Sequence, residues 1–329
     1  MSLPLALAVA VEPWPIAGSF GISRGTKTVA VTVVAELSDG VARGRGECVP
    51  YARYGESVDS VMAQINAMRP RLTAGLDRKA LQTVMPPGAA RNALDCAFWD
   101  LEAKRGKRPV HEIAGLPAPH AVTTAYTISL ADPGVMAKAA EVAASCALLK
   151  IKLGAEGDPA RIAAVRAAAP KAVLIVDANE GWNDTNLMAN LTACAEAGVV
   201  LIEQPLPEGH DQALAQMQRP IPVCADESVH DRSSLSALAG KYDAVNVKLD
   251  KAGGLTEAFA VSAEAQRQNF TIMAGCMVAT SLAMAPAILI AQQARFVDLD
   301  GPLLLSRDRA DGLRYGDSLV HPPSPSLWG

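Results

Sequence analysis

From about residue 120 onward, short apolar runs alternate with longer alanine-rich stretches whose apolar positions recur at helical spacing. Each run is short enough for a buried parallel strand, and each stretch between two runs is long enough for a helix. The pattern predicts eight strands separated by seven helices. The strands are expected at residues 123–130, 148–153, 172–178, 199–204, 221–225, 244–249, 271–276 and 295–299.

This alternation indicates parallel strands that are joined by right-handed helical crossovers. Eight strands at this length favour a closed (β/α)8-type barrel, here in the modified TIM form (β/α)7β, over an open doubly wound sheet. The open sheet is disfavoured because no G-x-G-x-x-G motif follows the first strand. We therefore expect an α/β protein whose barrel domain covers residues 119–302.

The residues before 119 follow a different pattern. An apolar stretch at 3–11 and alternating segments at 28–37 and 41–48 predict strands, whereas 57–69 and 88–104 have helical spacing. We expect a separate α+β capping domain over residues 1–118. After Pro302 the rhythm of strand and helix ends, and we expect residues 303–329 to return to that domain and complete it.

Composition narrows the class of protein. Half of the 329 residues are hydrophobic and 19% are charged, as in a water-soluble protein with a large core. The net charge of −4 gives no basic footprint for nucleic acid, and no apolar run reaches the roughly 18 residues of a membrane span. Six scattered cysteines without a C-x-x-C pair predict reduced thiols, which favours a cytoplasmic protein.

Charged residues stand at the ends of five neighbouring predicted strands, which is where barrel enzymes carry their chemistry. In chain order they are Lys150-Ile151-Lys152, Asp177-Ala178-Asn179, Glu203-Gln204-Pro205, Asp226-Glu227 and Lys248. Three carboxylates around one barrel mouth would repel one another unless they shared a cation. Because their oxygens are hard ligands, the sequence predicts a Mg²⁺ site.

The lysines on both flanks of this predicted metal site indicate acid–base chemistry. Lys150 and Lys152 are two apart on one strand, so their side chains point to the same face. Neighbouring positive charges can lower a lysine pKa from about 10.4 toward 7 to 8, where the amine is an effective base. Two lysines on opposite sides of a planar enolate can each remove or return a proton at one face, which inverts a stereocentre.

These motifs, together with N-x-K-L-D-K-x-G-G at residues 246–254, resemble the muconate lactonizing subgroup of the enolase superfamily. The resemblance implies that Lys152 and Lys248 are the acid/base residues. It also implies that Lys150 tunes Lys152 and contacts the substrate. The implied Mg²⁺ ligands are Asp177, Glu203 and Asp226. Asn179 and Glu227 are expected to hold these ligands in place without binding the ion themselves.

Two further features resemble the dipeptide epimerases of this superfamily. Asp298-Leu299-Asp300 ends the eighth strand, where those enzymes bind the α-ammonium group of the dipeptide. Arg24 lies in a loop of the capping domain, where an arginine pairs with the side chain of a glutamate residue. Residues 46–57 and 89–96 also resemble bacterial Ala-Glu epimerases. The resemblance implies an isomerase acting on L-Ala-D/L-Glu in murein peptide recycling, whose partners are the dipeptide and, at most, further copies of the chain in a homo-oligomer.

Other functions stay open on the sequence. A relative of the same superfamily could act on another dipeptide, racemise N-succinylamino acids, form o-succinylbenzoate or catalyse a cycloisomerisation. The Asp298 and Asp300 carboxylates argue against these acylated or wholly anionic substrates. A barrel lyase that forms a Schiff base through Lys152 or Lys248 would not need three metal ligands. A non-catalytic metal-binding barrel would not need the pair of lysines.

Overall fold

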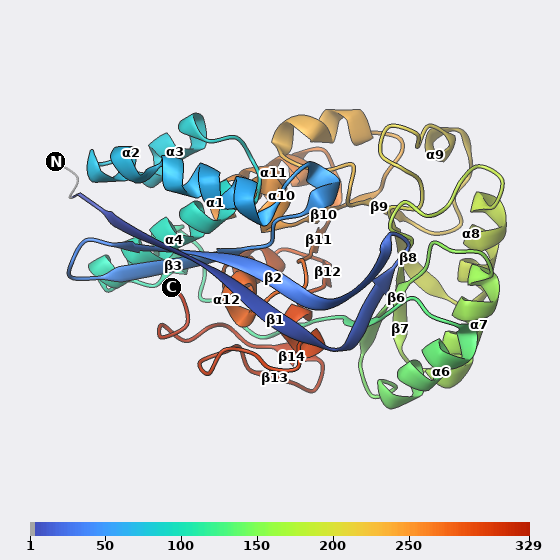
Figure 1. Ribbon diagram of the computed structural model, residues 1–329. Helices are drawn as coiled ribbons and strands as arrows, with labels where there is room; N and C mark the ends of the chain where they lie inside the picture. The colour runs from blue at the N-terminus through green and yellow to red at the C-terminus, as the bar shows by residue number, and fades with distance from the viewer. Residues whose placement is uncertain (1–3) are drawn as a thin grey trace.

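The computed structural model describes residues 4–329, and its largest sheet has eight parallel strands that pair in chain order (Figure 1). The sheet curls until its two ends meet, where the Ala125 N–H beside the first strand donates to the Val297 carbonyl in the last at 2.8 Å. The predicted α/β barrel fold is confirmed. Its strands are β5 (Tyr126–Ile128), β6 (Leu148–Lys152), β7 (Val173–Asp177), β8 (Val199–Glu203), β9 (Val223–Ala225), β10 (Ala244–Val247), β11 (Thr271–Ala274) and β12 (Phe296–Val297).

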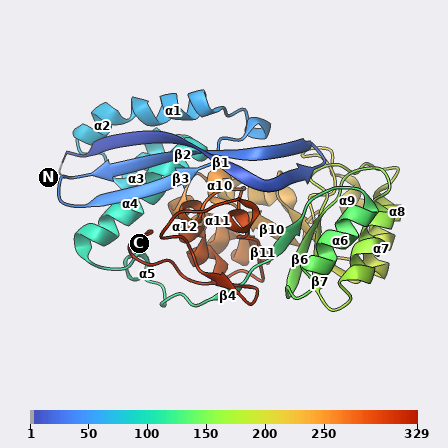
Figure 2. The same ribbon diagram turned by 60° about the horizontal axis from the view of Figure 1, so that its bottom comes forward.

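Helices cover the outside of the barrel, as Figure 2 shows for the group beside β6 and β7. They are α6 (Pro133–Val142), α7 (Asp158–Ala168), α8 (Leu187–Glu196), α9 (Ala213–Gln216), α10 (Leu249–Ala252), α11 (Leu255–Arg267) and α12 (Ser281–Ala291). The crossover from β9 to β10 differs from the predicted α-helix, because it contains the 3₁₀ helix η2 (Arg232–Leu238). This segment is rich in serine, and Ser234 Oγ donates to the Asp231 carbonyl, so side chains compete here for helical hydrogen bonds.

The capping region is an antiparallel sheet of β1 (Ala6–Ile22), β2 (Gly25–Ser38) and β3 (Arg43–Cys48). The helices beside this sheet are α1 (Val58–Ala67), α2 (Arg69–Thr73), α3 (Arg78–Val84) and α4 (Ala89–Gly106). The predicted strand at 3–11 was too short, although residue 3 lies outside the described residues. The strand continues through Pro13 and Pro15, which it tolerates because β1 is an edge strand whose free side needs no N–H donor.

Helix α4 packs directly against β3. A Cβ atom at Gly44 would lie 2.2 Å from the Ala97 carbonyl oxygen, and one at Gly46 would lie 2.1 Å from that of Ala93. Because only glycine leaves room for this approach, the alternating Gly44 and Gly46 fix the distance between helix and sheet. The β1–β2 hairpin extends from this layer to the mouth of the barrel (Figure 1).

The chain after the barrel contacts both regions. Following η3 (Gly301–Leu304), β13 (Tyr315–Gly316) and β14 (Leu319–Val320) form a small sheet with β4 (Val122–Thr123). The last residues reach α4 and the short α5 (Val110–Ile113), and Trp328 Nε1 donates to the Cys96 carbonyl at 3.0 Å. The domain limits at 118/119 and 302/303 stay predictions.

All six cysteines are free thiols. No helix within residues 4–329 has the length and the apolar character that crossing a bilayer requires.

Candidate active site

The predicted metal ligands meet at the carboxyl ends of three neighbouring strands. Asp177 ends β7, Glu203 ends β8 and Asp226 follows β9, and all three side chains are buried. One carboxylate oxygen from each lies within 4.8 Å of the oxygens from the other two. Parallel strands bring these residues together because their carboxyl ends lie at the same edge of the sheet.

The two predicted acid/base lysines lie beside this cluster. Lys152 Nζ is 2.6 Å from Asp177 Oδ2, and Lys248 Nζ is 2.6 Å from Asp226 Oδ2. Lys152 ends β6 and Lys248 follows β10, four strands further along the sheet of eight. Because the sheet curls into a barrel, a separation of four strands places the two lysines on opposite sides of its mouth.

Lys150 lies deeper in the barrel and joins the carboxylate cluster to the end of β12. Its Nζ is 2.7 Å from Glu203 Oε2, 2.7 Å from Asp298 Oδ2 and 3.1 Å from Asp177 Oδ2. Burial lowers the pKa of Lys150, but Asp298 and Glu203 outweigh burial and raise it well above its usual range. Lys150 is therefore a fixed positive charge on the same strand face as Lys152.

Lys251 also reaches the cluster, with its Nζ 2.6 Å from Asp226 Oδ1. It lies on α10 and is absent from the cavity lining, whereas Lys248 is part of that lining. Burial lowers the pKa of Lys251, whereas for Lys248 the nearby Asp226 and Glu203 outweigh burial and raise the pKa well above its usual range.

The nearby lysines do not stabilise the negative charges of the three carboxylates equally. Burial opposes ionisation of Asp177 and Asp226, but the adjacent lysines outweigh burial and hold both pKa values below their usual range. At Glu203, burial and the neighbouring Asp177 raise the pKa to about 7, and Lys150 offsets only part of that effect. The third negative charge is therefore the one that the protein's own lysines stabilise least.

A cavity of about 940 Å³ lies above the cluster, between the strand ends and two segments of the capping region. The barrel contributes Lys152, Asn179, Asp226, Glu227, Lys248, Cys276, Asp298 and Asp300 to its wall. The turn between β1 and β2 contributes Arg24, and the segment around η1 (Ala52–Tyr54) contributes Tyr51, Arg53 and Tyr54.

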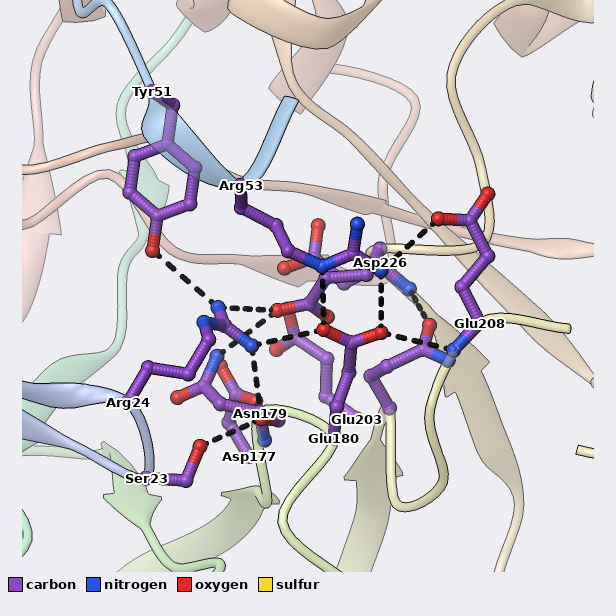
Figure 3. Close-up of polar contacts among 12 residues, drawn as sticks. Ser23, Arg24, Tyr51, Arg53, Asp177, Asn179, Glu180, Glu203, Glu208 and Asp226 are labelled. Carbon is purple, nitrogen blue, oxygen red and sulfur yellow. Dashed lines mark hydrogen bonds and ion pairs between the residues drawn. The ribbon is translucent and has the colours of Figure 1, made fainter. Parts of the chain in front are cut away.

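Arg24 reaches from its turn to the barrel (Figure 3). Its Nη2 is 2.7 Å from Glu227 Oε1, and its Nη1 donates to the Asn179 carbonyl at 2.9 Å. Asn179 Nδ2 in turn donates to Glu227 Oε1 at 3.5 Å. The predicted supporting residues Asn179 and Glu227 thus hold Arg24 at the cavity wall, as well as lying next to Asp177 and Asp226.

Both aspartates of the 298–300 motif line the cavity. Asp298 Oδ2 bonds to Lys150, while its Oδ1 is buried and accepts no hydrogen bond from the described residues. Asp300 Oδ2 accepts the Thr127 N–H at 2.6 Å, and burial and Asp298 raise the pKa of Asp300 to about 7. Lys150 thus bonds to only one oxygen of Asp298, and Asp298 Oδ1 and Asp300 have no ammonium partner among the described residues, so a second ammonium group could bind there.

Two residues that sequence reasoning did not assign position the cluster. The Gln204 side-chain oxygen accepts the Asp226 N–H at 2.9 Å, and Asn246 Nδ2 donates to Glu203 Oε1 at 2.7 Å. A polar Asn246 inside the apolar run Val245 to Val247 was a signal that could have revealed one of them.

Comparison with known protein families shows to which family the chain belongs. Residues 5–115 match the family described as mandelate racemase / muconate lactonizing enzyme, N-terminal domain, and residues 134–324 match enolase C-terminal domain-like proteins. The chain belongs to the mandelate racemase and muconate lactonizing enzyme family of the enolase superfamily.

Relatives within this family are isomerases. The L-Ala-D/L-Glu epimerase of Escherichia coli K12 is 47% identical over 94% of this chain and 97% of its own length. The N-acetyl-D-glutamate racemase of a Pseudoalteromonas species is 46% identical over 90% of this chain and 95% of its own. A crystal structure of an enolase family member from Agrobacterium tumefaciens, with bound sodium and L-Ala-L-Glu, is 56% identical, covers 99% of this chain and 100% of its own, and superposes with a TM-score of 0.97.

Proposed function

We propose that the chain is a dipeptide epimerase that inverts the glutamate α-carbon of L-Ala-D/L-Glu. One observation carries the proposal: Lys152 and Lys248 reach the same cavity from strand ends on opposite sides of the barrel mouth. A carbon held between two amines can lose a proton to one and regain a proton from the other at its opposite face, which is the chemistry of epimerisation.

In the proposed reaction, one of Lys152 and Lys248 takes the α-proton as a neutral amine. The other, as an ammonium, donates a proton to the planar carbon from the opposite side. Their roles exchange for the other stereoisomer. Lys150 remains protonated throughout, because Asp298 and Glu203 raise its pKa well above its usual range.

The donor set fits a magnesium ion. Asp177, Glu203 and Asp226 offer hard oxygen ligands within one small volume, and the incomplete compensation of Glu203 favours an added positive charge there. When bound, the ion would neutralise these carboxylates and stabilise the negative charge that develops on the substrate's carboxylate.

The two ends of the substrate would be recognised by opposite charges. Asp298 and Asp300 would bind the α-ammonium group, for which Asp298 Oδ1 is available. Arg24 would pair with the glutamate side chain, since its planar guanidinium matches a carboxylate. The proposed substrate is therefore a dipeptide with a free amino terminus and an acidic second residue.

The Pseudoalteromonas relative suggests N-acetyl-D-glutamate as a second candidate substrate. An acetylated amino group has no positive charge, so it would leave Asp298 Oδ1 without the cation that an ammonium group would bring. The Asp298 and Asp300 pair therefore favours the dipeptide.

The experiment follows the glutamate α-proton by NMR in D₂O, with L-Ala-D-Glu, N-acetyl-D-glutamate and a panel of other dipeptides, each with Mg²⁺ and with EDTA. Metal-dependent loss of the α-proton signal together with formation of L-Ala-L-Glu is the expected result. Exchange of N-acetyl-D-glutamate alone would refute the dipeptide assignment. Exchange of no compound would refute the proposed chemistry.

We further propose that the enzyme acts in the cytoplasm on dipeptides released from murein. A glutamyl dipeptide with a D-centre is a product of cell-wall breakdown, and this origin of the substrate supports the proposed role. The test uses a strain whose growth on L-Ala-D-Glu requires this chain. This growth is expected to be lost when the strain carries Lys248→Ala instead of the wild-type chain.

A further inference from the structure

Two cavity-lining segments of the capping region bind to the same carboxylate of the barrel. Glu180 lies in the loop after β7, close to Arg24 from the β1–β2 turn and Arg53 from η1 (Figure 3). Arg53 makes two bonds of 2.8 Å, from its Nε to Glu180 Oε2 and from its Nη2 to Oε1. Arg24 Nη1 reaches Glu180 Oε2 at 3.1 Å. One side chain thus bridges two arginines that are 29 positions apart in sequence.

The position of Glu180 is fixed by its own surroundings. Asn179 and Glu180 have left-handed backbone φ angles of 44° and 64°, which turn the chain sharply after β7. Glu180 Oε1 also accepts the Glu208 N–H from the loop after β8 at 2.9 Å. Its side chain is only 9% exposed, so the carboxylate is held between the barrel loops and the two arginines.

The remaining contacts of the two segments are mostly separate. Ser23 Oγ and Arg24 bind to the Asn179 carbonyl, and Arg24 binds to Glu227, so these contacts hold the turn alone. Arg53 has a second partner in Glu208 at 3.1 Å, which holds only the η1 segment. Two direct contacts join the segments, both to the neutral side chain of Tyr51. Arg24 Nη2 lies 3.3 Å from its hydroxyl, and Lys27 Nζ lies 4.9 Å from the centre of its ring.

We propose that Glu180 is a positioning residue that couples these two segments, so that Arg24 is held at the cavity wall only while the Arg53 segment is also docked. This rests on the proposed function in one respect, that Arg24 binds the acidic side chain of the substrate. Opening of either segment weakens the attachment of the other, and a substrate is bound tightly only when both are closed, because apparent affinity falls with the fraction of closed protein.

Hydrogen exchange tests the coupling independently of any substrate. In Glu180→Gln, exchange in peptides that cover residues 20–28 and 50–56 is expected to rise about five-fold in both. Arg53→Gln is expected to raise exchange at 20–28 as well, although among the described residues no hydrogen bond or ion pair joins Arg53 to that turn. Glu208→Gln is the matched control: it removes the other carboxylate partner of Arg53 but leaves the Arg53–Glu180 pair intact, so exchange at 20–28 is expected to rise clearly less than in Glu180→Gln.

Kinetics test the consequence for binding. With L-Ala-L-Glu, Glu180→Gln is expected to raise KM about five-fold and to change kcat less, whereas Glu180→Asp restores part of the loss. The proposal is overturned if Glu180→Gln and Arg53→Gln leave exchange at 20–28 unchanged, if Glu208→Gln raises it equally, or if KM does not move. A wild-type protein that epimerises no dipeptide would refute the proposed function, and the exchange experiment would still decide the coupling.

Discussion

We expect the wild-type protein to prefer substrates that carry an ammonium group, and Asp298→Asn to remove this preference. Asp298 is buried, and one of its oxygens bonds to Lys150 while the other has no partner among the described residues. The substitution keeps the shape of the side chain and removes its charge. Lys150 keeps Glu203 and Asp177 as partners, so the cluster below should hold its arrangement.

The size of the effect follows from the lost interaction. A charge-assisted hydrogen bond is worth about 1.5 to 3 kcal/mol, and each 1.4 kcal/mol is a factor of ten. For L-Ala-D-Glu, we expect kcat/KM of Asp298→Asn to fall about 10- to 150-fold. For N-acetyl-D-glutamate, which has no ammonium group, kcat/KM should change less than three-fold.

The assay is the initial rate of α-proton exchange for both substrates with wild-type and variant protein at saturating Mg²⁺. The informative quantity is the ratio of the two kcat/KM values, because damage to the metal cluster or the lysines would lower both rates equally. An unchanged ratio would refute the assignment of Asp298 to the ammonium group. Asp300→Asn is the companion variant, since its Oδ2 is already engaged by the Thr127 N–H and its effect on the ratio should be smaller.

Three further predictions concern the lysines and the stability of the fold. Lys152→Ala and Lys248→Ala should each lower epimerisation at least 1,000-fold, on the order expected for an essential acid or base, while one variant still exchanges deuterium into a single stereoisomer by NMR; full activity in both would contradict the two-base chemistry. Trp328→Ala should lower the free energy of unfolding in urea by about 3 to 5 kcal/mol, because its ring is 2% exposed and its indole N–H is bonded to α4; a loss below about 1 kcal/mol would mean that the C-terminal residues contribute little to the capping region. Burial raises the pKa of Asp250 to about 7, so ionisation of this carboxyl lowers the free energy of unfolding as the pH rises from about 4 to 7. The amide oxygen of Asp250→Asn can accept the same two N–H donors, so the variant should be more stable than wild type by about 2 to 4 kcal/mol at pH 8 and by nearly nothing at pH 4. Equal effects at both pH values would contradict this pKa.

The barrel and its charged cluster could be predicted because they depend on local order along the chain. Parallel strands place their carboxyl ends at one edge, so Lys152, Asp177 and Glu203 had to converge once the strands were recognised. The η2 helix was missed because serine hydroxyls compete with the backbone, an effect that apolar spacing does not report. The length of β1 was missed because proline normally ends a strand, and only the position of β1 at the sheet edge permits Pro13 and Pro15.

The contacts between the capping region and the barrel could not be predicted from the sequence, for a different reason. Arg53 and Glu180 are 127 positions apart and lie in irregular segments, so no periodicity brings them together. The resemblance alone links Arg24 to the substrate's carboxylate, and no sequence pattern indicates that Glu180 and Glu227 are its partners within the protein. Contacts of this kind depend on how the capping region packs against the barrel, which the spacing of apolar residues along the chain does not report.

Two carboxylates of this site are both predicted metal ligands and ion-pair partners of the predicted acid/base lysines. Asp177 holds Lys152 and Asp226 holds Lys248, each at 2.6 Å, so each predicted metal ligand is also the partner of a predicted base. While those carboxylates keep their full charge, Asp226 and Glu203 raise the pKa of Lys248 and keep it from acting as a base. Neutralising these carboxylates would lower the pKa of Lys248, because the opposite charges that raise it would be lost. We therefore expect proton removal by Lys248 to depend on a cation bound at these carboxylates.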